Sequence, residues 1–200
     1  MKQFFFAIAV LMATWTTAVT PASATAVDGT STALITSLGK AVVDILENPA
    51  LSPKERAEQY SAHFEKAFDW DRISAFAIGK YQRGVPRKKF VEYRDLFAQH
   101  MTRLYAAKFA DYSGEAFLVK GERQFGRGGS EVTAEIRDAN DRETVRLAFK
   151  VVQEDGKQRI YDVLINGVSL LVAKRSELKG IISRGGIDGL IAQLKKANTH

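Results

Sequence analysis

The sequence of 200 residues contains no cysteine and only three histidines. Without cysteine there is no disulfide bond, thiol nucleophile or thiolate metal ligand, so packing alone must stabilise the fold. The three histidines, His63, His100 and His200, have no second histidine or carboxylate at the spacing of a metal-binding motif. The sequence therefore predicts neither a metal site nor a bound cofactor.

Long runs of one charge are also missing. The chain has 29 Lys and Arg against 23 Asp and Glu, a formal net charge of +6, and both signs are scattered along it. This pattern predicts mostly solvated surface. An anionic membrane or an acidic protein is the alternative partner for the basic excess. Nucleic acid is not the expected partner, because the N-terminal segment described next predicts export.

The chain has one strongly apolar run, residues 4–12, which is shorter than the roughly 20 residues that span a membrane. Lys2 precedes this run, and Ala22-Ser23-Ala24 fits the small-x-small rule for signal cleavage. We therefore predict a cleaved Sec signal peptide over residues 1–24. The remaining residues, 25–200, are long enough for one domain with a sizeable core.

The N-terminal half has helical periodicity. Apolar residues recur at helical spacing over residues 33–46, and Ser52-Pro53 with Glu55 forms a capping-box pattern for a second helix. Asp69 or Asp71 is expected to cap a third, short helix. The longest predicted helix, residues 87–110, carries an aromatic stripe that includes Phe90, Tyr93, Phe97, Met101, Leu104 and Tyr105.

In the C-terminal half the period changes from 3.6 to 2. Apolar and polar residues alternate over 131–137 and 145–151, and turn residues separate these strands from further short apolar runs at 116–125, 160–165 and 168–172. The inward face of 160–165 is ambiguous. Two amphipathic helices, 175–183 and 187–197, follow. The prediction is an α+β fold in which N-terminal and C-terminal helices pack on one curved antiparallel sheet of about four to five strands.

No complete catalytic motif stands out. Gly167-Val168-Ser169 lacks the second glycine of a nucleophile elbow, because that position is Leu171. Asp69 or Asp162 as a base in an apolar cavity leaves an isomerase-like enzyme open as an alternative. The excess of apolar residues on the long helix and the strands is compatible with a filled core or with a cavity, and periodicity does not distinguish the two.

Several short blocks, taken in order, resemble one family. They are Phe68-Asp69, Gly79-Lys80-Tyr81, Tyr112–Glu115, Tyr161–Val163, Gly167–Leu170, Arg175–Leu178 and Gly185–Ile191. Their order and spacing resemble the MlaC/toluene-tolerance family of periplasmic phospholipid-binding proteins, in particular its hopanoid-associated branch. The chain departs from the family pattern at Gln82-Arg83, at Gln158–Ile160 and at Asn166, where tryptophans and an acidic residue are usual.

The resemblance implies a periplasmic, monomeric lipid carrier without catalytic activity. Such a carrier exchanges phospholipid, or a hopanoid-like lipid, with an inner-membrane ABC transporter complex and an outer-membrane lipoprotein complex. It implies a cone-like fold with an apolar cavity, for which we predict a helical wall of Phe76, Phe97, Met101, Leu104 and Tyr105. The predicted sheet wall is Val119, Ala134, Ile136, Leu147, Phe149, Val163, Ile165 and Val168. Lys174 and Arg175 are predicted to contact the headgroup or a partner. A non-catalytic periplasmic adaptor remains a further alternative.

Overall fold

The computed structural model describes residues 30–107, 112–126, 128–154 and 156–199. The predicted signal peptide lies outside these ranges. Four helices precede the sheet, namely α1 (Thr30–Glu47), α2 (Pro53–Ala67), α3 (Trp70–Ile78) and α4 (Arg87–Ala106), with a 3₁₀ turn η1 (Gly79–Gln82) after α3. The strands are β1 (Ala116–Phe125), β2 (Gly129–Arg137), β3 (Glu143–Glu154), β4 (Lys157–Ile165) and β5 (Val168–Ser169), and α5 (Leu170–Asn198) ends the chain.

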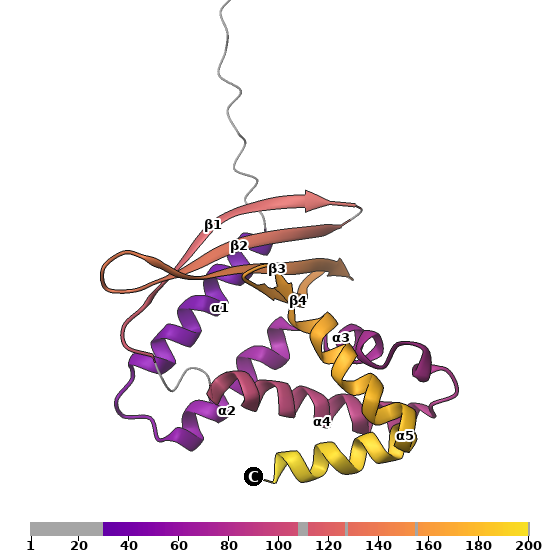
Figure 1. Cartoon of the computed structure of the whole chain (residues 1–200). Helices are drawn as coiled ribbons and strands as arrows, with labels where there is room; N and C mark the ends of the chain where they lie inside the picture. Colours follow the sequence, from indigo (N-terminus) through magenta and orange to yellow (C-terminus); the bar gives the residue numbers. More distant parts are fainter. Residues whose placement is uncertain (1–29, 108–111, 127, 155, 200) are drawn as a thin grey trace, which may run out of the picture.

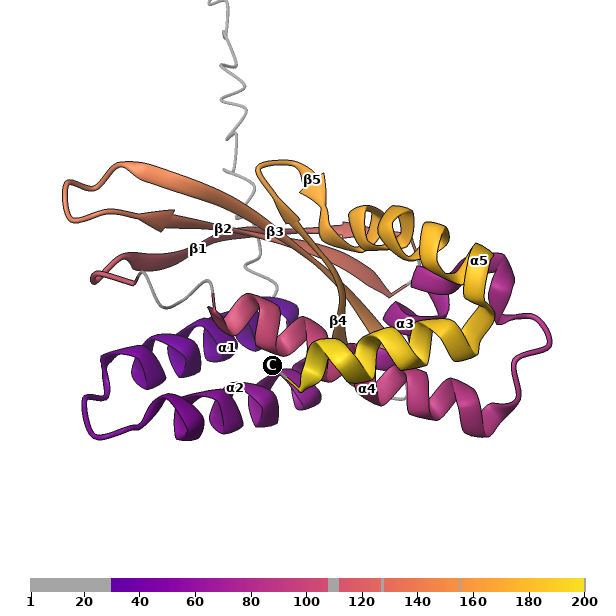
Figure 2. The ribbon, with the colours of Figure 1, turned by 60° about the horizontal axis from the view of Figure 1, so that its bottom comes forward.

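All helices lie on one side of the sheet or beyond its edge, so the molecule has a sheet layer and a helical layer (Figures 1 and 2). The strands form one antiparallel sheet in the order β1-β2-β3-β4-β5. This arrangement confirms the predicted α+β fold. In the described part of the chain, no helix is long and apolar enough to cross a membrane.

A β-bulge decides the ambiguous inward face of β4. Val151 pairs with Ile160, whereas Phe149 pairs with Val163, so the register shifts by one residue between these two pairs. The shift lets Ile160 and Val163 face the helices although they are an odd number of residues apart. Asp162 pairs with Lys150 and lies on the other face, where it reaches the start of α5.

Side-chain caps set two of the helix starts as predicted. Ser52 and Glu55 form the reciprocal capping box of α2, and Asp69 accepts from the backbone N–H of Arg72 at 2.9 Å to cap α3. The last strand is shorter than predicted, because α5 begins at Leu170 and not at Arg175. Ser169 caps α5 by accepting from Val172 N–H at 3.0 Å. The two predicted C-terminal helices are joined across a kink at Gly186, which has φ +61°.

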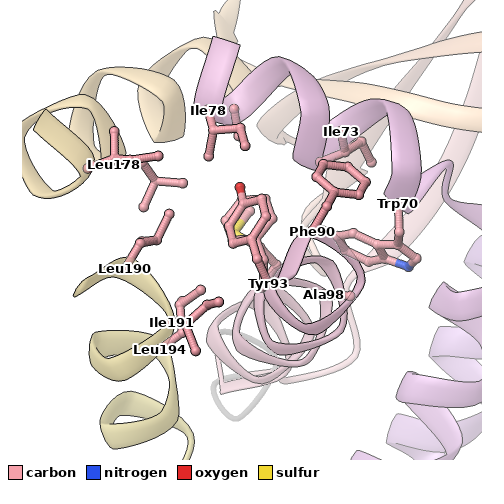
Figure 3. Packing of buried hydrophobic residues seen from close by; sticks show 14 of the residues in the cluster. Trp70, Ile73, Ile78, Phe90, Tyr93, Ala98, Leu178, Leu190, Ile191 and Leu194 are labelled. Carbon is pink, nitrogen blue, oxygen red and sulfur yellow. The ribbon is translucent and has the colours of Figure 1, made fainter. Parts of the chain in front are cut away.

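The structure has two hydrophobic cores. The first lies between the sheet and helices α1 and α2, and we call it the sheet core: Ile35, Ala67, Val132, Ala134, Phe149, Val151 and Ile160. The helical core lies among α2, α3, α4 and α5, with Tyr93 and Phe97 fully buried at its centre. Figure 3 shows Tyr93 with Phe90 and Ile73 on one side and leucines and isoleucines of α5 on the other. Phe68 and Leu38 pack against both cores and connect them.

Candidate functional site

The predicted helical wall lies on the inner face of α4. Phe97 and Met101 belong to the helical core, and the Phe97 ring stacks on Tyr93 with the ring centroids 5.6 Å apart. Tyr105 packs against the same core and is half-buried, as is Leu104. The wall is thus closed near Phe97 and retains exposed apolar surface toward the C-terminal end of α4.

The predicted sheet wall lies on the inner face of the sheet. Ala134 is fully buried and Phe149 is 8% exposed, both in the sheet core. Val119, Leu147 and Val163 are half-buried and pack against that core. The remaining inward residues, Ile136 and Ile165, are half-buried as well.

Burial on this inner face decreases from one end of the sheet to the other. The strand pairings align inward side chains in rows across the sheet. In the row of Gln124, Ser130, Val151 and Ile160, the last three residues are buried and only Gln124, on the edge strand β1, is exposed. The row of Val119, Ala134, Leu147 and Ile165 is buried only at Ala134, and the row of Phe117, Ile136 and Val145 is half-buried at all three positions.

Helix α1 explains this gradient. Its N-terminal end is tied to the buried end of the sheet, where Ser130 donates to the Ser31 hydroxyl at 2.7 Å and Ser31 also contacts the side chain of Gln158. Farther along α1, the Phe117 ring of β1 lies directly on Gly39. The half-buried residues of the last two rows form an apolar surface at this end of the inner face. We call it the open row surface: Phe117, Val119, Ile136, Val145, Leu147 and Ile165.

A hollow of about 760 Å³ lies between α1 and β1. This volume is within the range of about 300–1,000 Å³ that is typical of small-molecule sites. Phe117, Val119 and Val43 contribute apolar surface, and the rim is charged. The rim includes Lys40, Asp44, Glu47, Glu115 and Lys120. Val119 is the predicted wall residue that lines this hollow.

The two predicted headgroup residues differ in their surroundings. The Lys174 side chain is only 14% exposed, and its Nζ lies 2.6 Å from a Glu177 carboxylate oxygen. Burial, and the charge of the Lys174 ammonium, lower the pKa of His100 on α4. Burial and Glu177 raise the pKa of Tyr105 at the end of the α4 wall. Lys174 therefore belongs to a polar group that borders the helical wall.

Arg175, the second predicted headgroup residue, lies at the surface together with two predicted wall residues, Val168 and Phe76. Val168 is 62% exposed on β5, and Phe76 is 40% exposed on α3. The Arg175 guanidinium lies over the Phe76 ring at 4.7 Å from its centroid. Val168 and Phe76 are outside both cores, so the structure gives these two predicted wall residues no place in an interior wall.

The carboxylates of the enzyme alternative have structural partners. Asp162 accepts from the Ser169 hydroxyl at 2.7 Å and from Leu171 N–H at 3.2 Å, so both side chains hold the start of α5. Asp69 caps α3 and forms an ion pair with Arg72 at 2.9 Å. A hollow of about 370 Å³ at Asp69 is lined mainly by charged residues, which differs from the apolar cavity that raises the pKa of a catalytic carboxylate. Within the described ranges, no group of three His, Cys, Asp or Glu side chains is placed to hold a metal ion.

Sequence reasoning missed the contribution of α1. Leu38 and Val42 pack against the helical core, and Leu38 also packs against the sheet core, between the two predicted walls. Gly39 was the available signal, because a glycine inside an amphipathic helix marks a close approach. Lys174 was predicted for its charge, while the neighbouring His100 was not singled out.

Comparison with known proteins identifies the family. The model of the MlaC protein family matches residues 36–196, which include α2 to α4, the whole sheet and nearly all of α5. This chain belongs to the MlaC family.

Two known proteins that are similar to this chain illustrate the match. The chain is 24% identical over 123 residues to the intermembrane phospholipid transport system binding protein MlaC of Haemophilus influenzae. The aligned segment is 60% of this chain and spans 58% of the length of that curated relative. A solved structure of a phospholipid-binding protein from Ralstonia solanacearum, in complex with a phospholipid, superposes with a TM-score of 0.74 at 21% identity. The superposition covers 84% of this chain and 96% of that one, so the two proteins share the MlaC fold.

Proposed function

We propose that this protein is a periplasmic carrier that holds a phospholipid between the sheet and the helical layer. The observation that carries the proposal is the open row surface, an apolar face left half-exposed inside a fold that a phospholipid-bound protein shares. Contiguous exposed apolar patches mark interaction sites, and ligand-binding grooves are among them. The family membership supports the same function.

The energetics favour a carrier without a catalytic group. Two acyl chains contain on the order of 30 methylenes, and exposing each one to water costs about 0.8 kcal/mol. Transfer across an aqueous space therefore requires a protein surface that covers most of the chains. The apolar wall residues supply that surface, and no bond of the lipid has to be broken.

The polar group at Lys174 is the proposed contact of the headgroup. Lys174 and its partner Glu177 border the α4 wall, which contains His100 and ends at Tyr105. An ammonium group favours a phosphate oxygen by charge-assisted hydrogen bonding. Glu177 pairs with Lys174 in the described structure, so a phosphate would compete with a carboxylate for the same ammonium. For transfer partners we propose an inner-membrane ABC transporter complex and an outer-membrane lipoprotein complex, in keeping with the family.

A tryptophan on the open row surface tests the proposal. Leu147→Trp adds a large ring at a half-buried position and is expected to displace an acyl chain. The matched control is Leu118→Trp, since Leu118 is 40% exposed on β1 and alternates with the inward residues Phe117 and Val119. Lipid that co-purifies with each variant is extracted with organic solvent and quantified by mass spectrometry. Equal lipid content in two folded variants would contradict the assignment.

Ala134 is not a suitable position for the same test. Its side chain is fully buried in the sheet core, so a tryptophan there would overpack the core and destabilise the fold. Loss of lipid in that variant would then report unfolding. The predicted sheet wall includes both residues, but the burial of Ala134 leaves only Leu147 as a position for this test.

A further inference from the structure

Cationic side chains gather at one end of the helical layer, although the charges along the whole sequence are mixed. The segment from Gly79 to Lys89 contains five Lys and Arg residues and no Asp or Glu. It comprises η1 and the first residues of α4, and it lies at the end of the molecule opposite the turn between α1 and α2 (Figures 1 and 2).

Helix α5 brings two more cations to this end. The position that a Cβ of Gly79 would occupy lies 2.7 Å from a guanidinium nitrogen of Arg175, so Arg175 lies directly against the C-terminus of α3. Lys179 follows one turn later on the exposed side of α5. The start of α4 is joined to the same helix by an ion pair between Lys89 and Asp188 at 2.6 Å.

Most of these charges are not neutralised within the protein. Lys89 pairs with Asp188, Arg87 lies 4.0 Å from Asp71, and Glu177 is engaged by Lys174. Five exposed cations have no ion-pair partner among the described residues, and we call them the cationic end: Lys80, Arg83, Lys88, Arg175 and Lys179. The surface therefore presents an excess positive charge toward solvent.

An apolar side chain projects within this charged surface. Phe76 is 40% exposed, and Arg175 lies over its ring. Val172, which is 53% exposed, lies one turn before Arg175 and Ser176 on α5. Aromatic and aliphatic side chains among Lys and Arg residues are the composition of surfaces that rest at the headgroup level of a bilayer.

We propose that the cationic end docks on the surface of an anionic phospholipid bilayer. The five charges come from η1, the turn that follows it, α4 and α5. This spread suits the diffuse negative potential of a bilayer better than one defined acidic site on a protein. Each Lys or Arg near such a surface strengthens binding about fivefold, and salt weakens it. The docking does not require a lipid in the interior, so it goes beyond the carrier function and is tested separately from it.

The test is binding of the purified protein to vesicles, measured by co-sedimentation. One set contains phosphatidylcholine only, and the other contains roughly one third phosphatidylglycerol. The wild-type protein is expected to bind the vesicles that contain phosphatidylglycerol and not those of phosphatidylcholine only. It is expected to lose most of this binding when the salt concentration rises from about 0.1 M to 1 M, because the Debye length then shortens from about 10 Å to 3 Å.

A charge reversal identifies the surface. The triple variant Lys80→Glu, Arg83→Glu and Lys88→Glu is expected to bind anionic vesicles at least about tenfold more weakly. The control changes the net charge equally at exposed lysines away from this end, through Lys54→Glu, Lys157→Glu and Lys196→Glu. It is expected to keep binding within about threefold of the wild type.

Two outcomes would overturn the proposal. Equal loss in the two triple variants would show that only net charge matters, and absence of wild-type binding to anionic vesicles would leave an acidic protein as the partner of this end. Circular dichroism checks that both variants are folded. Their co-purified lipid content reports the carrier function independently, and we expect it to stay at the wild-type level.

Discussion

The contact between Gly39 and Phe117 offers a quantitative prediction. A Cβ added at Gly39 would lie 2.3 Å from two carbons of the Phe117 ring, well inside van der Waals contact. The ring must therefore shift by about 1 Å to reach the usual separation of about 3.5 Å. Phe117 also packs edge-on against Phe149 with the ring centroids 6.3 Å apart, so a shift disturbs the sheet core as well.

Two opposing effects determine the stability of Gly39→Ala. Alanine is favoured over glycine in a helix by about 1 kcal/mol, whereas overpacking a well-packed site costs about 1–3 kcal/mol. We expect a net loss of up to about 2 kcal/mol in the wild-type background. In a Phe117→Ala background the obstacle is gone, and Gly39→Ala is expected to stabilise by about 1 kcal/mol.

The assay is a double-mutant cycle by urea denaturation of the four proteins. The account predicts a coupling free energy of about 1–3 kcal/mol between positions 39 and 117. It also predicts that Gly39→Ala lowers the free energy of unfolding of the wild type and raises that of the Phe117→Ala variant. If Gly39→Ala stabilised both backgrounds equally, the proposed close approach of α1 and β1 would be refuted.

Two further predictions concern α5 and its neighbours. Ser169→Ala removes the cap of α5 and a hydrogen-bond donor to Asp162. We expect it to lower the free energy of unfolding, measured by urea denaturation, by about 1 kcal/mol. The control is Ser176→Ala within α5, which is expected to lower the free energy of unfolding by less than half of that amount. Burial and Lys174 lower the pKa of His100 in the folded protein, so the unfolded chain binds its proton more readily. Stability should therefore fall as the pH drops below about 6.5, and a flatter pH profile of the urea midpoint is expected for His100→Gln. An unchanged profile would contradict the placement of His100.

Much of the fold could be predicted because local signals agreed with the tertiary structure. Apolar and polar residues alternate in β2 and β3, as expected for a sheet with one face packed on the helices. The caps at Ser52 and Asp69 involve only residues close in sequence, so local sequence is sufficient to predict them. The prediction failed where long-range contacts decide. The end of β5 depends on Asp162, which accepts a hydrogen bond from the start of α5. Asp162 is in position for this contact because the bulge in β4 places it on the outer face of the sheet.

The candidate site was predictable by residue type and less so by position. Apolar periodicity marked Phe97, Leu147 and Phe149 as inward residues, and all three face the interior. The same pattern also marked Phe76, although its ring is exposed beside Arg175, because helical spacing does not reveal which stripe the neighbouring helices cover. The degree of cover by α1 likewise depends on the packing of Gly39, which no period encodes.

The lipid content of the purified protein tests the central claim most directly. Protein produced from the full sequence of 200 residues is purified without detergent and extracted with organic solvent. The extract is analysed by mass spectrometry, and native mass spectrometry gives the stoichiometry. The account predicts one phospholipid per protein chain, with the acyl chains protected by the open row surface. A hopanoid in its place would change the cargo while keeping the carrier. A folded, lipid-free protein that also fails to take up phospholipid from vesicles would contradict the account.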